Sequence, residues 1–340
     1  MGQISKFGAA ALPLLLACSG PAAETCPAGT TEAAAGGCVE QVQQAGRSYQ
    51  GRSYQGRSYQ GAGPAVSTIL GISVGGVAVE GVEIQGTVLK GTVGGQTLSG
   101  ADFIGATVTQ VDGDWAFDAT ITNVQADPGD PSGEVLLYTL KAQNLDTGTL
   151  DNICDPDPWG GQYATPIYGS WDQTGARQNI TTDMMFGCTS GVVAKCVRWG
   201  YKPWKTVNGK SLADYHQACT RMARADYCGD GVSHTMDATL IDMYDDLRIQ
   251  EKTPFQLLSP LLFDAAWTPK GAYCMAKDRW LQLLSLATVT VECKTKFLNL
   301  FPLLETSPVD SSDLCLIKRS DVARSEVRID NRSALNISLN

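Results

Sequence analysis

Between residues 66 and 150 apolar and polar residues alternate in short runs that glycine interrupts. Runs at 77–80, 82–85, 87–90, 115–122 and 134–140 show this alternation. Period-two alternation bounded by glycine is typical of half-buried β-strands. We therefore expect a glycine-rich antiparallel β region over residues 66–150.

A clear helical pattern occurs once, over residues 211–226. Its apolar stripe consists of Leu212, Tyr215, Cys219, Met222 and Ala223. Ser211 followed three residues later by Asp214 is typical of a helix start, and Gly229 is typical of a helix stop. Together with the β region, this helix predicts an α+β protein whose second half is a mixed α/β domain.

The N-terminus carries one lysine, Lys6, then an apolar run over residues 7–17 and a cysteine, Cys18. This run is too short to span a bilayer and is typical of a secretory signal peptide. Residues 15–18 resemble a bacterial lipobox, in which the cysteine thiol is acylated. We expect a signal peptide at 1–17 and a lipid anchor at Cys18. The alternative is an ordinary signal peptide with an incidental cysteine.

Residues 18–65 are rich in small and polar residues and have little to bury. A five-residue unit, Gly46-Arg-Ser-Tyr-Gln50, occurs three times in tandem and ends at Gln60. A repeat this short with one aromatic residue cannot form a core of its own, so we expect a flexible tether.

The chain has 26 basic and 35 acidic residues, a formal net charge of −9. The basic residues are spread along the chain and form no cluster. The charge disfavours binding to nucleic acid or to an anionic membrane surface, so we expect no nucleic-acid partner.

Eleven cysteines are too many for ordinary cytosolic use. If Cys18 is acylated, an even number remains, and no Cys-x-x-Cys pair is present to suggest zinc or thioredoxin-type chemistry. We therefore predict disulfides. The ten cysteines are Cys26, Cys38, Cys154, Cys188, Cys196, Cys219, Cys228, Cys274, Cys293 and Cys315. Cys219 and Cys228 are out of phase on a helix and should have different partners, but the remaining pairing stays open.

A set of short motifs resembles the ADYC domain, a family named for a tetrapeptide that occurs here at residues 225–228. Further matching segments lie at 195–204, 218–224, 239–242 and 265–274, and the resemblance covers about residues 151–320. Members of this family are mostly lipoproteins of predatory Gram-negative soil bacteria. The resemblance implies a lipid-anchored location at the outer membrane or cell surface, and it implies no particular chemistry.

Two kinds of chemistry are open around residues 226–237. Cys228 and His234, with aspartates nearby, have the residue types of a thiol enzyme or hydrolase. Asp226, Asp230 and Asp237 occupy positions 1, 5 and 12 of a calcium-loop pattern, with glycine at position 6. Position 3 is Cys228, which supplies no hard oxygen, so the alternative is an acidic turn after a helix.

Aromatic residues alternate with glycine, proline and glutamine over 157–173. They are Trp159, Tyr163, Tyr168 and Trp171. Flat aromatic faces beside amides can bind sugar rings or protein partners, although most such residues pack internally. A glycan or protein partner is therefore a further hypothesis.

These patterns divide the chain into five parts: a lipoprotein signal peptide (1–17), a tether (18–65), a β-rich region (66–150), a disulfide-rich ADYC-like domain (151–325) and a tail (326–340). We expect a lipid-anchored, extracytoplasmic, non-catalytic binding or structural module without a cofactor. The alternatives are the enzyme centred on Cys228 and His234 and a calcium-binding module.

Overall fold

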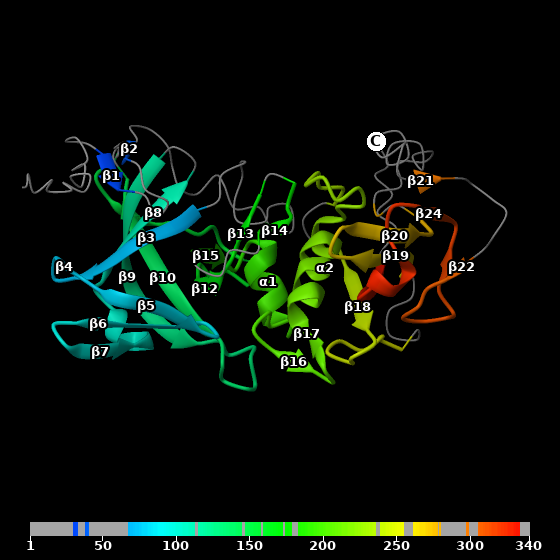
Figure 1. The fold of residues 1–340 in the computed structure, drawn as a ribbon, viewed down its shortest axis with the longest axis horizontal. Coiled ribbons are helices and arrows are strands. Elements are labelled where there is room, and N and C mark those ends of the chain that lie inside the picture. Colours follow the sequence, from blue (N-terminus) through cyan, green and yellow to red (C-terminus); the bar gives the residue numbers. More distant parts are fainter. Residues whose placement is uncertain are drawn as a thin grey trace, which may run out of the picture.

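A computed structural model describes a protein with two large antiparallel sheets and two α-helices between them (Figure 1). The described residues are 30–32, 38–40, 67–112, 115–144, 147–157, 159–172, 174–178, 183–235, 239–254, 261–277, 279, 297–298 and 305–333. Within them the chain is mostly β, and the broad α+β expectation is confirmed.

The larger sheet has eight strands. They are β3 (Ser67–Val74), β4 (Val77–Ala78), β8 (Thr107–Asp112), β9 (Trp115–Ala126), β10 (Leu136–Gln143), β11 (Leu150–Asn152), β12 (Ala164–Tyr168) and β15 (Met184–Cys188). Their order is β15-β12-β10-β9-β8-β3-β4, and β11 pairs with β10. Since β12 and β15 follow residue 150, one sheet spans the position where we expected a domain boundary.

A three-stranded sheet lies beside the larger one. It consists of β5 (Glu80–Gln85), β6 (Val88–Val93) and β7 (Gln96–Ser99), followed by a 3-10 helix, Gly100–Phe103. Gly94 and Gly95 both have positive φ in the two-residue turn between β6 and β7, as a tight hairpin requires. The two sheets share one apolar core, in which the backbone N–H of Leu89 donates to the hydroxyl of Tyr138 at 3.1 Å.

The second large sheet has six strands. They are β18 (Ile241–Asp245), β19 (Leu262–Thr268), β20 (Gly271–Met275), β21 (Phe297–Leu298), β24 (Ile317–Arg319) and β25 (Ile329–Ser333). Their order is β18-β25-β19-β20-β24-β21. The last strand in the sequence therefore lies inside the sheet, between β18 and β19. Residues 329–333, which belong to the expected 326–340 tail, are therefore part of this sheet.

Short two-stranded pairs complete the β structure. They are β1 (Thr30–Glu32) with β2 (Cys38–Glu40), β13 (Ser170–Trp171) with β14 (Arg177–Gln178), β16 (Thr206–Val207) with β17 (Lys210–Ser211), and β22 (Glu305–Thr306) with β23 (Leu314–Cys315). A 3-10 helix spans Arg324–Glu326. The β1–β2 hairpin falls within the expected tether. The pentapeptide repeats, Cys18, Cys26 and the signal segment lie outside the described residues.

The two helices are α1 (Val192–Arg198) and α2 (Leu212–Arg224). Helix α2 confirms the prediction, and the hydroxyl of Ser211 accepts the N–H of Ala213 at its start. It ends at Arg224 with Ala225 as its C-cap, before the expected stop at Gly229. We did not predict α1, because its seven residues are too few to show a helical period in the sequence. Neither helix is long and apolar enough to cross a bilayer, and the same holds throughout the described part of the chain.

Helix α2 is buried on both of its faces. One face packs against Trp267, Ile329 and other apolar residues of the six-stranded sheet. On the other face, His216 Nε2 lies 3.0 Å from the carbonyl oxygen of Val193 on α1. Burial lowers the pKa of His216 to about 3, so this imidazole is neutral near pH 7. His216 is thus a packing residue between two helices.

Three disulfides are formed among the described residues. Cys196–Cys219 joins α1 to α2, Cys154–Cys188 ties the segment after β11 to β15, and Cys274–Cys315 joins β20 to β23. These bonds confirm the prediction that cysteines cross-link the second half. Cys293 lies outside the described residues.

Ion pairs connect the β9–β10 loop to the segment after α1. Arg198 contacts Asp127 at 2.7 Å and Asp157 at 3.1 Å, and Lys202 contacts Asp130 and Glu134 at 2.9 Å each. Most of these side chains are largely buried, so solvent screens them less than surface pairs. The contacts hold the eight-stranded sheet and the helical layer together.

Candidate functional site

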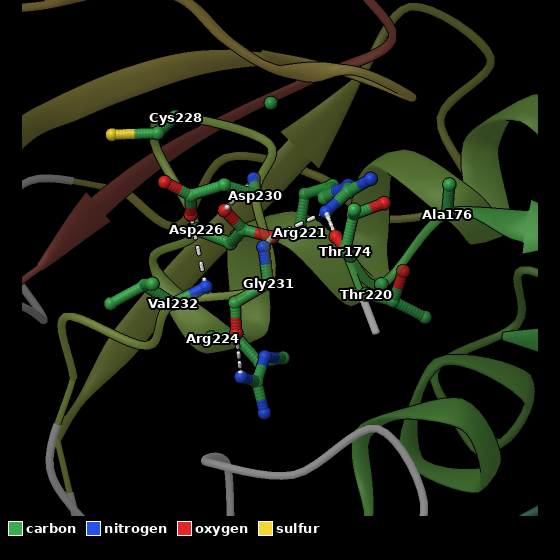
Figure 2. A network of polar contacts seen from close by, with 12 residues as sticks. Thr174, Ala176, Thr220, Arg221, Arg224, Asp226, Cys228, Asp230, Gly231 and Val232 are labelled. Atoms are coloured by element: carbon green, nitrogen blue, oxygen red, sulfur yellow. Dashed lines mark hydrogen bonds and ion pairs between the residues drawn. The ribbon is translucent and has the colours of Figure 1, made fainter. Parts of the chain in front are cut away.

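The residues that carried most of the sequence hypotheses lie in one turn, residues 225–231, at the end of α2 (Figure 2). Ala225 adopts the left-handed conformation, with φ 52° and ψ 43°. The N–H of Ala225 donates to Met222 O, and the N–H of Asp226 donates to Arg221 O at 2.9 Å. This hydrogen-bond pattern is a Schellman-type helix end and reverses the chain over the helix C-terminus.

Asp226 is buried inside this turn and ion-paired with Arg221. Its two carboxylate oxygens accept the backbone N–H groups of Asp230 and Gly231, each at 3.1 Å (Figure 2). Arg221 also donates to the carbonyl oxygens of Thr174 and Pro269. The guanidinium therefore neutralises Asp226 and ties the turn to two other segments.

The other members of the calcium pattern are placed differently. Asp230 is exposed, and its carboxylate accepts the N–H of Val232 at 3.0 Å, which is a local turn contact. Asp237 lies outside the described residues. In the part of the chain that is described, no three His, Cys, Asp or Glu side chains are arranged to hold a metal ion. The calcium site stays a prediction, although Arg221 already supplies positive charge at Asp226.

Tyr227 is fully buried and connects the turn to the six-stranded sheet. Its ring stacks on Trp267 with 5.0 Å between ring centroids. The Tyr227 hydroxyl donates to Asp264 Oδ1 at 2.7 Å and accepts the backbone N–H of Arg279 at 2.8 Å. Both hydrogen-bonding functions of the phenol are therefore used internally.

Asp264 and Arg279 form a fully buried ion pair beneath Tyr227, with 2.9 Å between Arg279 Nε and Asp264 Oδ2. Asn331 donates to the same oxygen, also at 2.9 Å, and accepts from the indole N–H of Trp267. Burial alone would raise the pKa of Asp264, but the charges of Arg279 and Lys277, with hydrogen bonds from Tyr227 and Asn331, hold it below its usual value.

The guanidinium of Arg279 also caps helix α2. It donates to Met222 O at 2.8 Å and to Ala223 O at 3.3 Å. These carbonyl groups belong to the last turn of the helix, where a positive charge is favourable. One arginine thus joins the helix end, the sheet carboxylate and the segment that follows β20.

Cys228 is disulfide-bonded and buried, so it has no thiol in this structure. Arg319 donates to the backbone carbonyl oxygens of Tyr227, Cys228 and Lys270 at 2.9–3.2 Å. A Cβ atom added to Gly229, which has a positive φ of 68°, would lie only 1.9 Å from Lys270 O. Only glycine therefore fits where the turn meets the β19–β20 hairpin.

His234 lies against the backbone of the same turn. Its Nδ1 is 3.1 Å from Ala225 O, and its ring centroid is 5.8 Å from that of Tyr227. Because a carbonyl can only accept, Nδ1 carries the proton in this contact. His234 therefore supports the turn through its contact with Ala225 O.

The four aromatic residues of 157–173 do not form one surface. Trp171 is buried, and its indole N–H donates to Gln217 on α2. Tyr163 and Tyr168 are half-buried, whereas Trp159 is 76% exposed. The Cζ atom of Arg198 lies 5.7 Å from the centroid of the Trp159 ring, so the guanidinium faces the indole. Of these four residues, only Trp159 is largely exposed.

The residues that sequence reasoning missed are the buried charges around the turn: Arg221, Asp264, Arg279 and Arg319. The one available signal was the occurrence of charged residues beside or within apolar runs, as at Asp264 next to Ala265 and Ala266. Such a residue is costly to bury unless it is paired, but the sequence does not say which partner it has.

Comparison with known proteins gives one match. A family model described as the ADYC domain matches residues 100–281, starting about fifty residues before the segment that carried the resemblance. No curated protein and no solved structure matches the chain.

We expect Tyr227→Phe to lower the free energy of unfolding by about 2–3 kcal/mol, since a buried carboxylate loses a hydrogen bond and a buried N–H loses its acceptor. Urea unfolding followed by circular dichroism measures this loss. The control is Tyr273→Phe, which removes a hydroxyl bonded to the half-buried Glu305 and should cost less than about 1 kcal/mol. Equal losses in the two variants would show that the Tyr227 hydroxyl has no special structural role.

Proposed function

Because this chain belongs to the ADYC domain family, we propose that it is an exported, disulfide-stabilised, non-catalytic binding or structural module with a lipid anchor at Cys18. The observation that carries this proposal is the use of the whole tetrapeptide in internal contacts. Ala225 ends a helix, Asp226 pairs with Arg221, Tyr227 bonds Asp264, and Cys228 is in a disulfide. None of the four presents a reactive group at the surface.

The disulfides support an oxidising compartment. Disulfides of this kind persist outside the cytoplasm and are rare where thiols are kept reduced. Three bonds link distant parts of the described chain, with 23 to 41 residues between the cysteines. This agrees with the expected signal peptide and with a protein that works at the cell envelope.

A non-catalytic module needs a contact surface, and we assign it to Trp159. Asp157 Oδ1 accepts the backbone N–H groups of Trp159 and Gly161, at 3.0 and 2.8 Å, while Asp157 Oδ2 holds Arg198 beneath the indole. The exposed ring is thus fixed on one side and open on the other. A rigid aromatic face binds the apolar face of a sugar ring or a protein side chain at little entropic cost.

The burial of Cys228 and the contact of His234 disfavour the alternative of a thiol enzyme. A thiol nucleophile at Cys228 would require reduction of its disulfide and exposure of a residue that is 1% accessible. His234 would also have to leave its contact with Ala225 O.

Thiol labelling separates these two functions. In the native, mature protein we expect no alkylation of Cys228 by iodoacetamide, because its sulfur is already bonded. Mass spectrometry of the labelled digest measures this, and the linked Cys196–Cys219 peptides in the same digest confirm that the protein was oxidised. A native protein that carries the label on Cys228 would favour the thiol enzyme.

The anchor is tested at Cys18. We expect the wild-type protein to sediment with membranes and to incorporate labelled palmitate, and Cys18→Ser to lose both properties because the acceptor thiol is gone. Cys26→Ser is the matched control, since Cys26 is a nearby cysteine without a lipobox. Membrane association that survives Cys18→Ser would refute the lipid anchor.

The contact surface is tested with Trp159→Ala. Retention on immobilised peptidoglycan, chitin and cellulose is compared with that of Leu150→Ala, which removes another exposed apolar side chain. We expect Trp159→Ala to weaken retention on a binding polymer about tenfold, roughly 1.4 kcal/mol, and Leu150→Ala to leave it unchanged. If the wild-type protein binds none of the polymers, the partner is not a glycan of these classes.

A further inference from the structure

The face of the six-stranded sheet that points away from α2 carries a group of aspartates. Tyr244 on β18 pairs in register with Asp330 on β25, and Asp242 pairs with Arg332. The neighbouring residue Asn331 points the other way, toward Asp264. On the aspartate side the sheet is covered by the segment 305–316, which includes β22 and β23 and which we call the latch segment.

The latch segment brings two more carboxyl groups to this face. The Tyr244 hydroxyl donates to Asp313 Oδ2. Lys252 donates to Asp310 Oδ2 at 2.5 Å and to both oxygens of Asp313 at 3.1 Å. These contacts are the polar attachment of the segment to the sheet.

Asp330 lies beneath these contacts with 0% exposure. Ser307 and the backbone of Asp310 lie close to it, but neither carboxyl oxygen makes a hydrogen bond of good geometry. Asp242 Oδ2 is likewise without a hydrogen-bond partner, while Asp242 Oδ1 accepts from Thr253. Three buried carboxyl oxygens therefore lack a hydrogen bond of good geometry.

Positive charge at this face is limited. From the elements packed around Asp330, the described residues supply Lys252, which is committed to Asp310 and Asp313, and Arg332, which lies over the ring of Tyr244 at 5.7 Å. Strand β19 contributes the uncharged Ala266 opposite Asp330. Four carboxyl groups thus face two cations, and no described set of side chains is arranged to hold a metal ion.

A buried carboxyl group without a partner takes up a proton instead of remaining charged. Burial raises the pKa of Asp330 well above its usual value, and the charges of Asp313 and Asp310 add to this. Burial also raises the pKa of Asp313 to about 6, with the charges of Asp310 and Asp242 acting in the same direction. A folded state that binds protons more tightly than the unfolded state loses stability as pH rises through these pKa values.

We propose that the latch segment is held on the sheet while Asp330 is protonated, and that it is released locally when Asp330 ionises. Repulsion among the four carboxylates then acts across the contact between the segment and the sheet. The Cys274–Cys315 disulfide keeps one end of the segment attached to β20, so release opens the region of 307–313 without unfolding the sheet.

The test compares melting temperatures of the wild-type protein and Asp330→Asn between pH 5.5 and pH 8. Asparagine resembles the protonated acid, so we expect the variant to gain about 3 °C or more relative to wild type as pH rises. Other titrating groups, including His216, cancel in this difference because both proteins carry them. Glu83→Gln, which removes an exposed carboxyl group on β5, should follow the wild-type curve.

Hydrogen exchange locates the change. At pH 8 the amides of 307–313 should exchange faster in the wild-type protein than in Asp330→Asn, and at pH 5.5 the two should agree. If Asp330→Asn does not fold, Asp330→Ser, which also removes the buried carboxyl group, tests the same contact with the same expected sign. Parallel melting curves for wild type and the variant would overturn the proposal. So would a rise in wild-type melting temperature on adding calcium at pH 8 that Asp330→Asn abolishes, since that result assigns the cluster to a metal ion.

Discussion

The buried ion pair between Asp264 and Arg279 is the contact on which the second half of the molecule depends. It lies where the end of α2, the 225–231 turn and the six-stranded sheet meet. Removing two charges from water is costly, and the attraction between them compensates only when further hydrogen bonds satisfy both groups. Here Tyr227, Asn331 and two helix carbonyls supply those bonds, so each of these elements is fixed by the requirements of one pair.

The disulfides add a different kind of constraint. Cys196–Cys219 joins the two helices, which lie between the sheets in Figure 1. Cys274–Cys315 joins strand β20 of the six-stranded sheet to β23 of the β22–β23 pair. A cross-link of this kind stabilises chiefly by restricting the unfolded chain, by about 3–4 kcal/mol for loops of this length in the entropy model. It does not favour one compact structure over another. The buried arginines Arg221, Arg279 and Arg319 favour the native structure, because each donates to several specific oxygens.

The sequence predicted strands where apolar and polar residues alternate, as in 115–122 and 134–140. It predicted helix α2 from its apolar stripe and its cap at Ser211, although nearly all of this helix is buried. Strand β20 is buried on both faces and α1 has only seven residues, so neither carries a periodic pattern that the sequence reveals. At the candidate site, sequence spacing placed Asp226, Cys228, Asp230 and His234 close together, and the structure places them in or beside one turn. The spacing could not show that Arg221 neutralises Asp226, because that depends on the reversal of the chain at Ala225.

The two faces of β25 show two solutions to the same problem. Asn331 points to the side on which Asp264 is paired with Arg279, and the pKa of that carboxyl group is lowered. Asp330, one residue earlier, points to the side on which no guanidinium reaches it among the described residues, and its pKa is raised. Arg279 keeps the buried Asp264 charged over the whole physiological pH range, so this contact does not depend on pH. A proton can leave Asp330, so the contact that depends on this proton is reversible. This contact lies beneath the latch segment, and releasing the segment leaves the packing of the helices on the sheet unchanged.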